Sequence, residues 1–369
     1  MTHLKSEYSL ERTRAVGPQH PFVDRLMQSW PPQNWIDLPV VVAVSGGSDS
    51  VALLLGLKAM QDQLLGGQNV TGDAYPASSA TTSHGKLIVG HFHHGFRGSD
   101  ADDDASFVHS LCTARKIPCE IGYVDPEEIE KTPGEGWEST LRQRRYSFLL
   151  ELAERHGARY VATGHTADDQ VETILHRVVR GTGLRGLAGM PRSRPLSPAV
   201  SLIRPILTLP RSVACDYLQA VGIEWQTDAS NADPEFTRNR IRHELLPLLE
   251  NDFNPQVSNA ILRLGQLAGE AQEMVDQVIA GELENCVLRT SATEIQLDVY
   301  KLVTHPDFLL REMLIEIWRE AGWPLQAMGL NEWQSLAELL RQPDGAVTTL
   351  PGGVVAKKEG GKLSLHRPR

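Results

Sequence analysis

The chain has 369 residues, of which 41% are hydrophobic and 22% are charged, so it is long enough for two domains and can bury a core. This composition excludes global disorder, and no apolar run approaches the roughly 18 residues that a membrane-spanning helix needs. A net charge of −10 argues against a nucleic-acid binder with a uniformly basic surface. We expect a soluble, cytoplasmic protein without a membrane partner.

The first half of the chain alternates strand and helix patterns. Residues 1–20 are polar and aperiodic, which predicts a loose tail. Short continuous apolar runs, typical of buried parallel strands, occupy 39–44, 86–92, 118–124 and 159–163. Helical patterns lie between them at 50–65, 101–115 and 138–156. This alternation predicts an α/β domain with a parallel, Rossmann-like sheet covered on both faces, and residues 66–85 read as a surface insertion.

The second half of the chain is dominated by helical patterns. They cover 211–221, 236–250, 255–283, 307–321 and 330–340. Short extended runs around two glycine pairs near the C-terminus predict a small terminal hairpin. Because Asp, Asn and Pro cluster between Thr227 and Pro234, we place a domain boundary there, with an α/β domain at 1–228 and a mainly helical domain at 229–369.

A glycine- and serine-rich loop follows the first predicted strand and opens the first helix. Its residues are Ser45, Gly46, Gly47, Ser48, Asp49 and Ser50. Glycines allow a tight turn and close approach of a ligand, and the free N–H groups at a helix start favour an anion. The loop therefore predicts a pyrophosphate cradle, although it lacks the GK[ST] of a Walker A loop and a simple capped turn is the alternative. Asp49 fits an anion site if Mg²⁺ bridges it to the phosphates.

Polar residues also follow two other predicted strands. The segment from His91 to Gly98 closes the second strand, at the edge where open α/β sheets place their ligands. His91 and His93 themselves are interpreted as packing residues at the strand end. After the fourth strand, Asp169 lies four residues beyond His165 and three before Glu172. Such a cluster suits binding and deprotonating a cationic amine, while simple stabilisation of a helix N-terminus and a metal site stay open as alternatives.

Arginines are concentrated in the middle of the chain. Residues 177–242 contain ten arginines, no lysine and five acidic residues, so this stretch carries +5 and the rest carries −15. A local basic face can bind phosphates on an acidic protein. Arg238 and Arg242 are four apart on a predicted helix, and Arg142 and Arg145 are three apart on another. Each pair can present both guanidinium groups to one side, although a salt-bridged surface is the simpler interpretation.

Taken together, these segments carry a family resemblance. The 45–50 loop resembles the PP-loop of the N-type ATP pyrophosphatases, and the stretch from about Val40 to Pro255 resembles the tRNA(Ile)-lysidine synthetases. The matching positions are His91, His94, Gly95, Arg97, Arg142, Arg145, Tyr146, His165, Asp168, Asp169, Glu172, Thr173, Arg238, Asn239 and Arg242. Phe96, Ser139 and Leu141 replace the usual leucine and alanines, and the C-terminal third matches only loosely.

The resemblance implies a fold, a reaction and partners. The expected fold is a PP-loop domain followed by a tRNA- or substrate-binding domain. The expected reaction is ATP-dependent ligation of free L-lysine to carbon 2 of the wobble cytidine of an isoleucine tRNA with a CAU anticodon. An adenylated cytidine is the intermediate, and lysidine, AMP and pyrophosphate are the products. The oligomeric state stays open, a homodimer included.

The resemblance also implies roles for residues. The 45–50 loop would bind ATP, with Mg²⁺ on Asp49. Arg145 and His165 would stabilise the α-phosphate, and Asp169 and Glu172 would hold the lysine amine, with Asp169 as its base. The expected tRNA contacts are Arg97, Arg142, Arg238, Arg240 and Arg242.

Three other functions remain as alternatives. By the same resemblance, a tRNA thiolase would also carry this loop. Such thiolases, however, use cysteine pairs or clusters to carry sulfur. The four cysteines here, Cys112, Cys119, Cys215 and Cys286, are scattered without a CxxC pair. Another PP-loop adenylating synthetase would leave the arginine-rich segment unexplained. A non-catalytic tRNA-binding protein would not need the acids of the predicted site.

Overall fold

The computed structural model describes residues 20–67, 85–93, 95, 99–124, 137–226, 237–325 and 327–368. The predicted loose tail, apart from His20, and most of the predicted 66–85 insertion lie outside these ranges. The chain divides into two compact units, Met1–Gly265 and Gln266–Arg369. The domain boundary expected between 228 and 229 falls within residues 227–236, which are also outside the described part, and it stays a prediction.

The first unit is built on a six-stranded, mostly parallel sheet. Its order is β3-β2-β1-β4-β6-β5, and only the edge strand β5 pairs antiparallel. The strands are β1 (Val40–Ala43), β2 (Leu87–His93), β3 (Cys119–Tyr123), β4 (Tyr160–Thr163), β5 (Ser193–Pro195) and β6 (Ser201–Ile203). The four strands expected from apolar runs are confirmed. The runs that form β5 and β6 have three residues each and are too short to be recognised from hydrophobic pattern.

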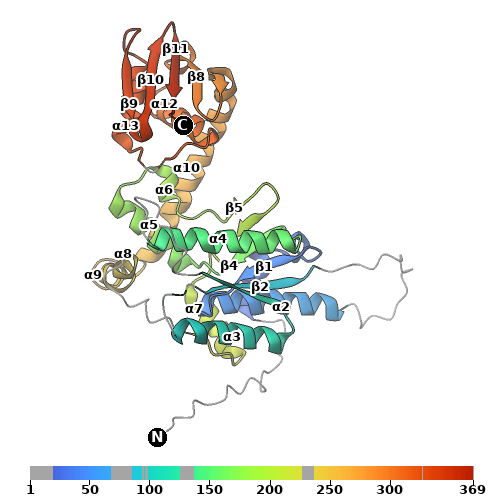
Figure 1. Cartoon of the computed structure of the whole chain (residues 1–369). Coiled ribbons are helices and arrows are strands. Elements are labelled where there is room, and N and C mark those ends of the chain that lie inside the picture. The colour runs from blue at the N-terminus through green and yellow to red at the C-terminus, as the bar shows by residue number, and fades with distance from the viewer. Residues whose placement is uncertain are drawn as a thin grey trace. The chain divides into compact units, whose positions relative to one another are not determined.

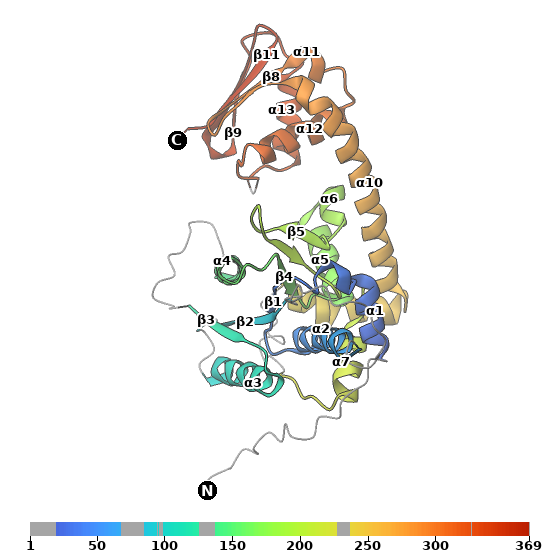
Figure 2. The same cartoon turned by 90° about the vertical axis from the view of Figure 1, so that its right-hand side faces the viewer.

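Helices cover both faces of this sheet, as Figures 1 and 2 show. One face carries α4 (Trp137–Arg155), and the other carries α2 (Ser48–Gly67), α3 (Ser99–Arg115) and α7 (Arg211–Ala220). A further helix, α1 (Pro21–Ser29), packs on α2 and α7. Successive side chains of β1 point to opposite faces of the sheet. Val41 belongs to the core under α4, and Val42 belongs to the core under α2.

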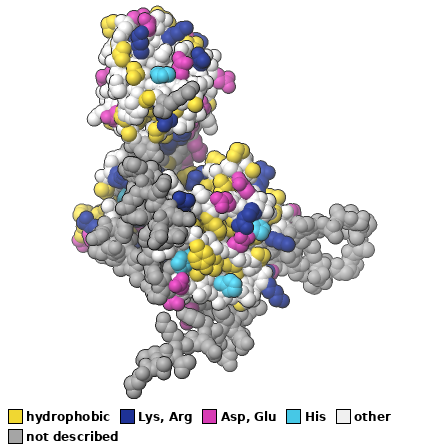
Figure 3. Space-filling view, viewed as in Figure 1, with side chains coloured by type: hydrophobic (Ala, Val, Ile, Leu, Met, Phe, Trp, Pro, Cys, Tyr) yellow, Lys and Arg dark blue, Asp and Glu magenta, His cyan; other side chains and the backbone are white. Residues whose placement is uncertain are grey.

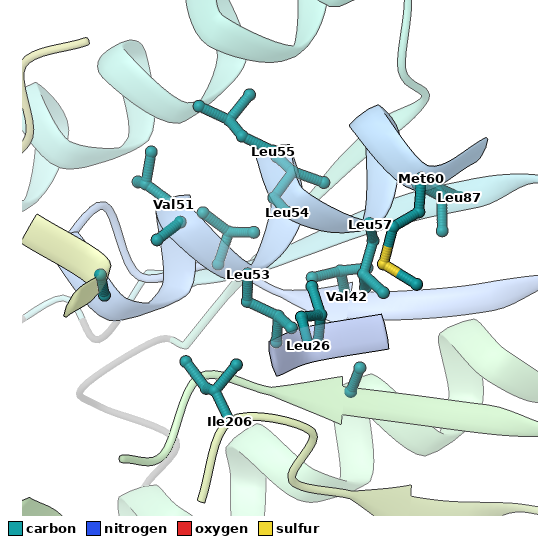
Figure 4. Close-up of a cluster of buried hydrophobic side chains, with 14 of the residues drawn as sticks. Leu26, Val42, Val51, Leu53, Leu54, Leu55, Leu57, Met60, Leu87 and Ile206 are labelled. Atoms are coloured by element: carbon teal, nitrogen blue, oxygen red, sulfur yellow. The ribbon is translucent and has the colours of Figure 1, made fainter. Parts of the chain in front are cut away.

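The start of α2 is fixed by the larger of these cores. Figure 4 shows Leu53, Leu54 and Leu57 of α2 among side chains from β1, β2 and α1. All three leucines are fully buried, and each contributes roughly 1.5–3 kcal/mol by leaving water. The loop that precedes α2 is therefore attached to a rigid element.

A second group of helices follows β4. It comprises α5 (Ala167–Arg180), α6 (Leu184–Leu187), α8 (Thr237–Arg240), the π-helical turn η5 (Ile241–Leu245) and α9 (Leu246–Asp252). The single helix expected over 236–250 is thus three consecutive pieces. Pro247 lies in the first turn of α9, and because proline lacks an N–H it cannot continue an α-helical hydrogen-bond ladder from the residues before it.

The second unit contains a five-stranded antiparallel sheet of order β7-β8-β11-β10-β9. The strands are β7 (Val287–Thr290), β8 (Glu294–Asp298), β9 (Val347–Leu350), β10 (Val354–Glu359) and β11 (Lys362–His366). The helices are α10 (Val257–Cys286), which starts in the first unit, α11 (Val299–Leu302), α12 (Asp307–Glu320) and α13 (Leu330–Leu339). On the face shown in Figure 3, basic and acidic side chains of this unit are interspersed.

The prediction for the C-terminal region needs a correction. The expected terminal hairpin is present as β10 and β11, but it belongs to a larger, five-stranded sheet rather than being a small addition to a mainly helical domain. Strand β7 follows α10 directly and is mostly exposed, so it shows neither a turn signal nor an apolar alternation. Within the described residues, no helix is long and apolar enough to cross a membrane.

Candidate active site

The glycine-rich loop is held by its own serines. The backbone N–H of Ser45 donates to the Ser50 hydroxyl (3.1 Å), and that hydroxyl donates to the carbonyl of Gly47 (3.0 Å). Gly46 has φ +98°, a conformation that side-chain-bearing residues rarely adopt. The loop joins the carboxyl end of β1 to the first turn of α2, so its N–H groups and the helix dipole favour an anion at this edge.

Asp49, in the first turn of α2, is paired with an arginine that the sequence interpretation missed. Arg211 Nε donates to Asp49 Oδ2 at 2.8 Å, and the backbone N–H of Arg211 donates to Asp168 Oδ2 at 2.8 Å. Burial raises the pKa of Asp49, and the Arg211 guanidinium opposes this effect. Arg211 is the first residue of α7, where the helix dipole disfavours a cation. That unfavourable placement is the sequence signal that could have identified it.

Asp169 uses its two carboxylate oxygens for different partners. Oδ2 accepts from the N–H (2.8 Å) and the hydroxyl (3.0 Å) of Thr166, which fixes the start of α5. Oδ1 faces Arg211 Nη2 at 3.4 Å and Arg238 Nη2 at 3.1 Å. Burial acts to raise the pKa of Asp169, but Arg211, the Thr166 N–H and Arg238 outweigh it, so the net pKa is lowered. Asp169 is therefore ionised at neutral pH.

Glu172, one turn further along α5, is enclosed by two arginines. Arg238 Nε donates to Oε2 at 2.9 Å, and Arg242 donates through Nε to Oε1 (2.5 Å) and through Nη2 to Oε2 (2.9 Å). The Glu172 side chain is only 2% exposed. A carboxylate buried this deeply requires such charge-assisted hydrogen bonds.

These contacts bring together residues for which the sequence predicted separate roles. Arg238 and Arg242, the expected tRNA contacts, are the ion-pair partners of the acids expected to bind lysine. Three carboxylates (Asp49, Asp169, Glu172) thus face three guanidinium groups (Arg211, Arg238, Arg242). The formal charges of these six residues, which we call the acid–arginine site, cancel, and Asp168 adds a further carboxylate beside Arg211.

His165 lies beside this site as a neutral imidazole. Burial lowers its pKa to about 3, the guanidinium groups of Arg204 and Arg145 act in the same direction, and Asp169 opposes them. Its Nδ1 lies 2.9 Å from the Thr163 hydroxyl at the end of β4. At neutral pH His165 can therefore donate or accept a hydrogen bond but carries no charge.

The remaining predicted residues are placed as follows. Arg142 and Arg145 both lie over the ring of Tyr146 on α4. Arg240 forms an exposed ion pair with Glu244 at 3.2 Å, which matches the simpler interpretation of a salt-bridged surface. Arg97 lies outside the described residues. His91 is buried and contacts the carbonyl of Val44 at 2.8 Å, in agreement with a packing role.

Comparisons with known proteins identify the family of the chain. The family model described as "PP-loop domain" matches residues 24–249. The chain is 35% identical over 338 residues to the tRNA(Ile)-lysidine synthase of Rhodopirellula baltica, which covers 85% of this chain and 83% of that protein. It is also 34% identical to the enzyme of Geobacillus kaustophilus over 74% of this chain, and 30% identical to that of Bacillus subtilis over 72% of it. The chain spans about half the length of these two, 54% and 52%.

A solved structure shares the fold. The U34-tRNA thiolase NcsA from Methanococcus maripaludis superposes with a TM-score of 0.51 at 16% identity, over 67% of this chain and 78% of that one. At this identity the likeness concerns the fold alone. The family assignment instead rests on the match of the PP-loop domain and on the sequence identity to the Rhodopirellula protein over most of both chains. The chain belongs to the tRNA(Ile)-lysidine synthase family.

Proposed function

We propose that this protein is an ATP-dependent ligase that joins free L-lysine to carbon 2 of the wobble cytidine of a CAU-anticodon isoleucine tRNA. The observation that carries the proposal is the pairing of Asp169 and Glu172 with guanidinium groups, one helix away from the glycine-rich loop. A pair of buried carboxylates that already binds side-chain cations is suited to bind the ammonium group of lysine.

The first step would be adenylation of the cytidine. The oxygen on carbon 2 of the base attacks the α-phosphate of ATP, the bond to the β-phosphate breaks, and pyrophosphate leaves. The loop around Gly46 and Gly47 would bind the leaving pyrophosphate through N–H groups at the start of α2. His165, as a neutral hydrogen-bond donor, and Arg145 would stabilise the α-phosphate.

The site also fits Mg²⁺ bound together with ATP. Mg²⁺ is typically held by one or two carboxylates together with substrate phosphates. Asp49, in the phosphate loop and the first turn of α2, offers one carboxylate. The guanidinium group of Arg211 already pairs with it. Mg²⁺ bound there would offset the negative charge of the phosphates.

The second step would transfer lysine. The ε-ammonium loses a proton, the amine attacks carbon 2 of the adenylated base, and AMP leaves with the original oxygen. Asp169 and Glu172 would bind the amine, and Asp169, which borders His165, would accept the proton. The lowered pKa of Asp169 makes it a stronger ligand for the cation and a weaker base while Arg211 and Arg238 remain beside it.

The direct test combines the protein with Mg-ATP, radiolabelled lysine and a transcript of the CAU-anticodon isoleucine tRNA. The methionine tRNA, which has the same anticodon, is the control. We expect label in the isoleucine tRNA only, with one AMP released for each lysine attached. AMP release without label would mean that the second substrate is not lysine. The absence of both signals from folded, ATP-binding protein would refute the proposed reaction.

The thiolase alternative would need a reactive cysteine pair. Cys112 on α3 and Cys119 on β3 do come within hydrogen-bonding reach of each other, whereas Cys215 and Cys286 lie on α7 and α10, and all four are free thiols. Cys112 and Cys286 are buried. The acid–arginine site, by contrast, has a direct use in binding an amine.

A further inference from the structure

A cluster of arginines surrounds Tyr146 on α4, and several of them lie close enough to His165 to interact with it electrostatically. The guanidinium carbons of Arg142 and Arg145 lie 5.2 and 5.3 Å from the centroid of the Tyr146 ring, and that of Arg194, from β5, lies 4.8 Å away. Arg204, the residue after β6, is only 2% exposed, and its guanidinium group also interacts electrostatically with Tyr146. Attraction to the ring face partly compensates for bringing these cations together.

The described part of the chain does not balance the positive charge of this cluster. Among the described residues, no carboxylate forms an ion pair with Arg142, Arg145, Arg194 or Arg204, in contrast to the acid–arginine site. Burial lowers the pKa of Arg142, and the neighbouring guanidinium groups of Arg145 and Arg194 lower it further. An anion between these groups would remove the repulsion.

Hydrogen-bonding capacity in the cluster is also unused. The Arg204 guanidinium lies beside the Tyr146 hydroxyl, but the Arg204 Nε and the Tyr146 hydroxyl, both buried, do not meet the geometry of a hydrogen bond with any described residue. Another nitrogen of Arg204, Nη1, donates to the carbonyl of Pro191 at 2.5 Å, which holds the side chain in place. A buried guanidinium N–H without an acceptor is costly, so its persistence points to a ligand that supplies one.

The position of the cluster indicates which anion this is. Ala162 of β4 pairs with Ile203 of β6, so Thr163 and Arg204 end neighbouring strands at the carboxyl edge of the sheet. The phosphate loop follows β1, two strands away in the order β1-β4-β6, which is about 10 Å. His165 follows β4, the strand between β1 and β6. In the proposed function the phosphates of ATP contact the loop and Arg145, so Arg142, Arg194 and Arg204 are left for a second phosphate-bearing molecule.

We propose that Arg194 and Arg204, together with Arg142, form a site for a backbone phosphate of the RNA strand, next to the nucleotide that is modified. The inference rests on the proposed function, because it takes RNA as the substrate. Guanidinium groups bind phosphate oxygens in pairs, and a fixed phosphate sets the position of the adjoining base. Neither Arg194 nor Arg204 has a role in the acid–arginine site.

The test compares Arg194→Gln with Arg192→Gln. Arg192 is two residues away, exposed, and donates to the Ser29 hydroxyl at 2.9 Å, so its substitution removes the same charge without touching the cluster. The measurement is the affinity for an anticodon stem-loop of the isoleucine tRNA at several salt concentrations, with the ATP KM determined in parallel. We expect R194Q to weaken RNA binding about tenfold and to reduce the salt slope by about 0.7–0.9. R192Q should leave both unchanged, and Arg194→Lys should recover most of the slope.

Other results would overturn the inference. If R194Q raises the ATP KM and leaves RNA affinity as in the wild type, the cluster binds a phosphate of ATP and not of RNA. If R194Q matches R192Q in both assays, the cluster is not a phosphate site. Wild-type protein that binds no stem-loop would contradict the proposed function as well, whereas lysine transfer with equal behaviour of the two variants would contradict only the arginine site.

Discussion

At the scale of single residues, Glu172 and Glu244 differ in that the first forms buried ion pairs and the second an exposed one. Both carboxylates are paired with arginines of the segment 238–242. The Glu172 side chain is 2% exposed and that of Glu244 is 56% exposed. Exposed pairs contribute about 0–1 kcal/mol, whereas loss of one partner of a buried pair costs about 3–5 kcal/mol.

We therefore expect Glu172→Gln to lower the free energy of unfolding by about 3–5 kcal/mol and to raise the KM for lysine at least tenfold, while the KM for ATP changes little. Glu244→Gln is the matched control and should change neither stability nor lysine KM appreciably. Urea unfolding and steady-state kinetics measure these quantities. Equal behaviour of the two variants would contradict a special role for Glu172.

The neutral state of His165 predicts how the unfolding free energy depends on pH. Its pKa is about 3 in the folded protein and about 6.5 in an unfolded chain, so between these values the unfolded chain binds more protons. The unfolding free energy should therefore fall as pH falls from about 6.5 towards 3, by up to about 1.4 kcal/mol per pH unit from this residue. His165→Gln should lose that contribution, and His109→Gln, at an exposed position, should keep it. Urea unfolding at several pH values measures the difference, and identical slopes would show that His165 is not buried as a neutral group.

The residues of the site were predictable to different degrees. Asp49, Asp169 and Glu172 follow strand ends in the sequence, so their convergence at one edge of a parallel sheet could be expected. Arg211 and Arg194 could not be recognised in the same way, because each belongs to a segment without a motif. The pairing of Arg238 and Arg242 with the acids also depends on how the segment after residue 236 folds back, which spacing alone does not specify.

At the scale of elements, the active edge depends on the close approach of the turn after β4 to the start of α2. A Cβ atom on Gly164 would lie 2.8 Å from the backbone of Asp49 and Ser50. Backbone cannot rotate away as a side chain can. Only glycine therefore allows the phosphate loop and the turn carrying His165 to lie side by side.

Gly164→Ala should consequently displace the start of α2, lower stability by about 1–3 kcal/mol and weaken ATP binding. Gly183→Ala is the control, because a Cβ there meets nothing within 4 Å and its φ is −88°. Thermal unfolding and an ATP binding titration measure the two effects. Retention of wild-type ATP affinity in G164A would contradict this account of the contact.

The elements themselves were largely predictable where hydrophobic pattern dominates. Strands β1 to β4 and helices α2, α3 and α4 follow the apolar runs and periodicities of the sequence closely. The π-helical turn at 241–245 was not predictable, because a helical periodicity does not reveal one extra residue in a turn. The strands of the C-terminal sheet were missed where they are short and half-exposed, since strand propensity depends on the neighbours that tertiary structure supplies.

At the scale of the whole molecule, the chain contains two units with separate cores. The first core surrounds α2 and β1, and the second is centred on Trp318, which makes edge contacts with Trp323 and Trp333. A unit with its own core can unfold in its own transition.

We expect two transitions in calorimetry. Leu149→Ala, in the core under α4, should lower only the transition of the first unit, and Leu310→Ala, in α12, only that of the second, each by about 2–5 kcal/mol in stability. Mg-ATP should raise the transition that Leu149→Ala lowers and leave the other unchanged. A single transition shifted equally by both variants would show that the units unfold together.

The charge balance of the acid–arginine site has a consequence for the order of events. Since three carboxylates already have three guanidinium partners, a lysine ammonium bound there, as we propose, would have to displace a guanidinium. A guanidinium released from Glu172 is then available to an RNA phosphate. By thermodynamic linkage, RNA should strengthen lysine binding by the same factor by which lysine strengthens RNA binding, so that the amino acid is retained only when its acceptor is present.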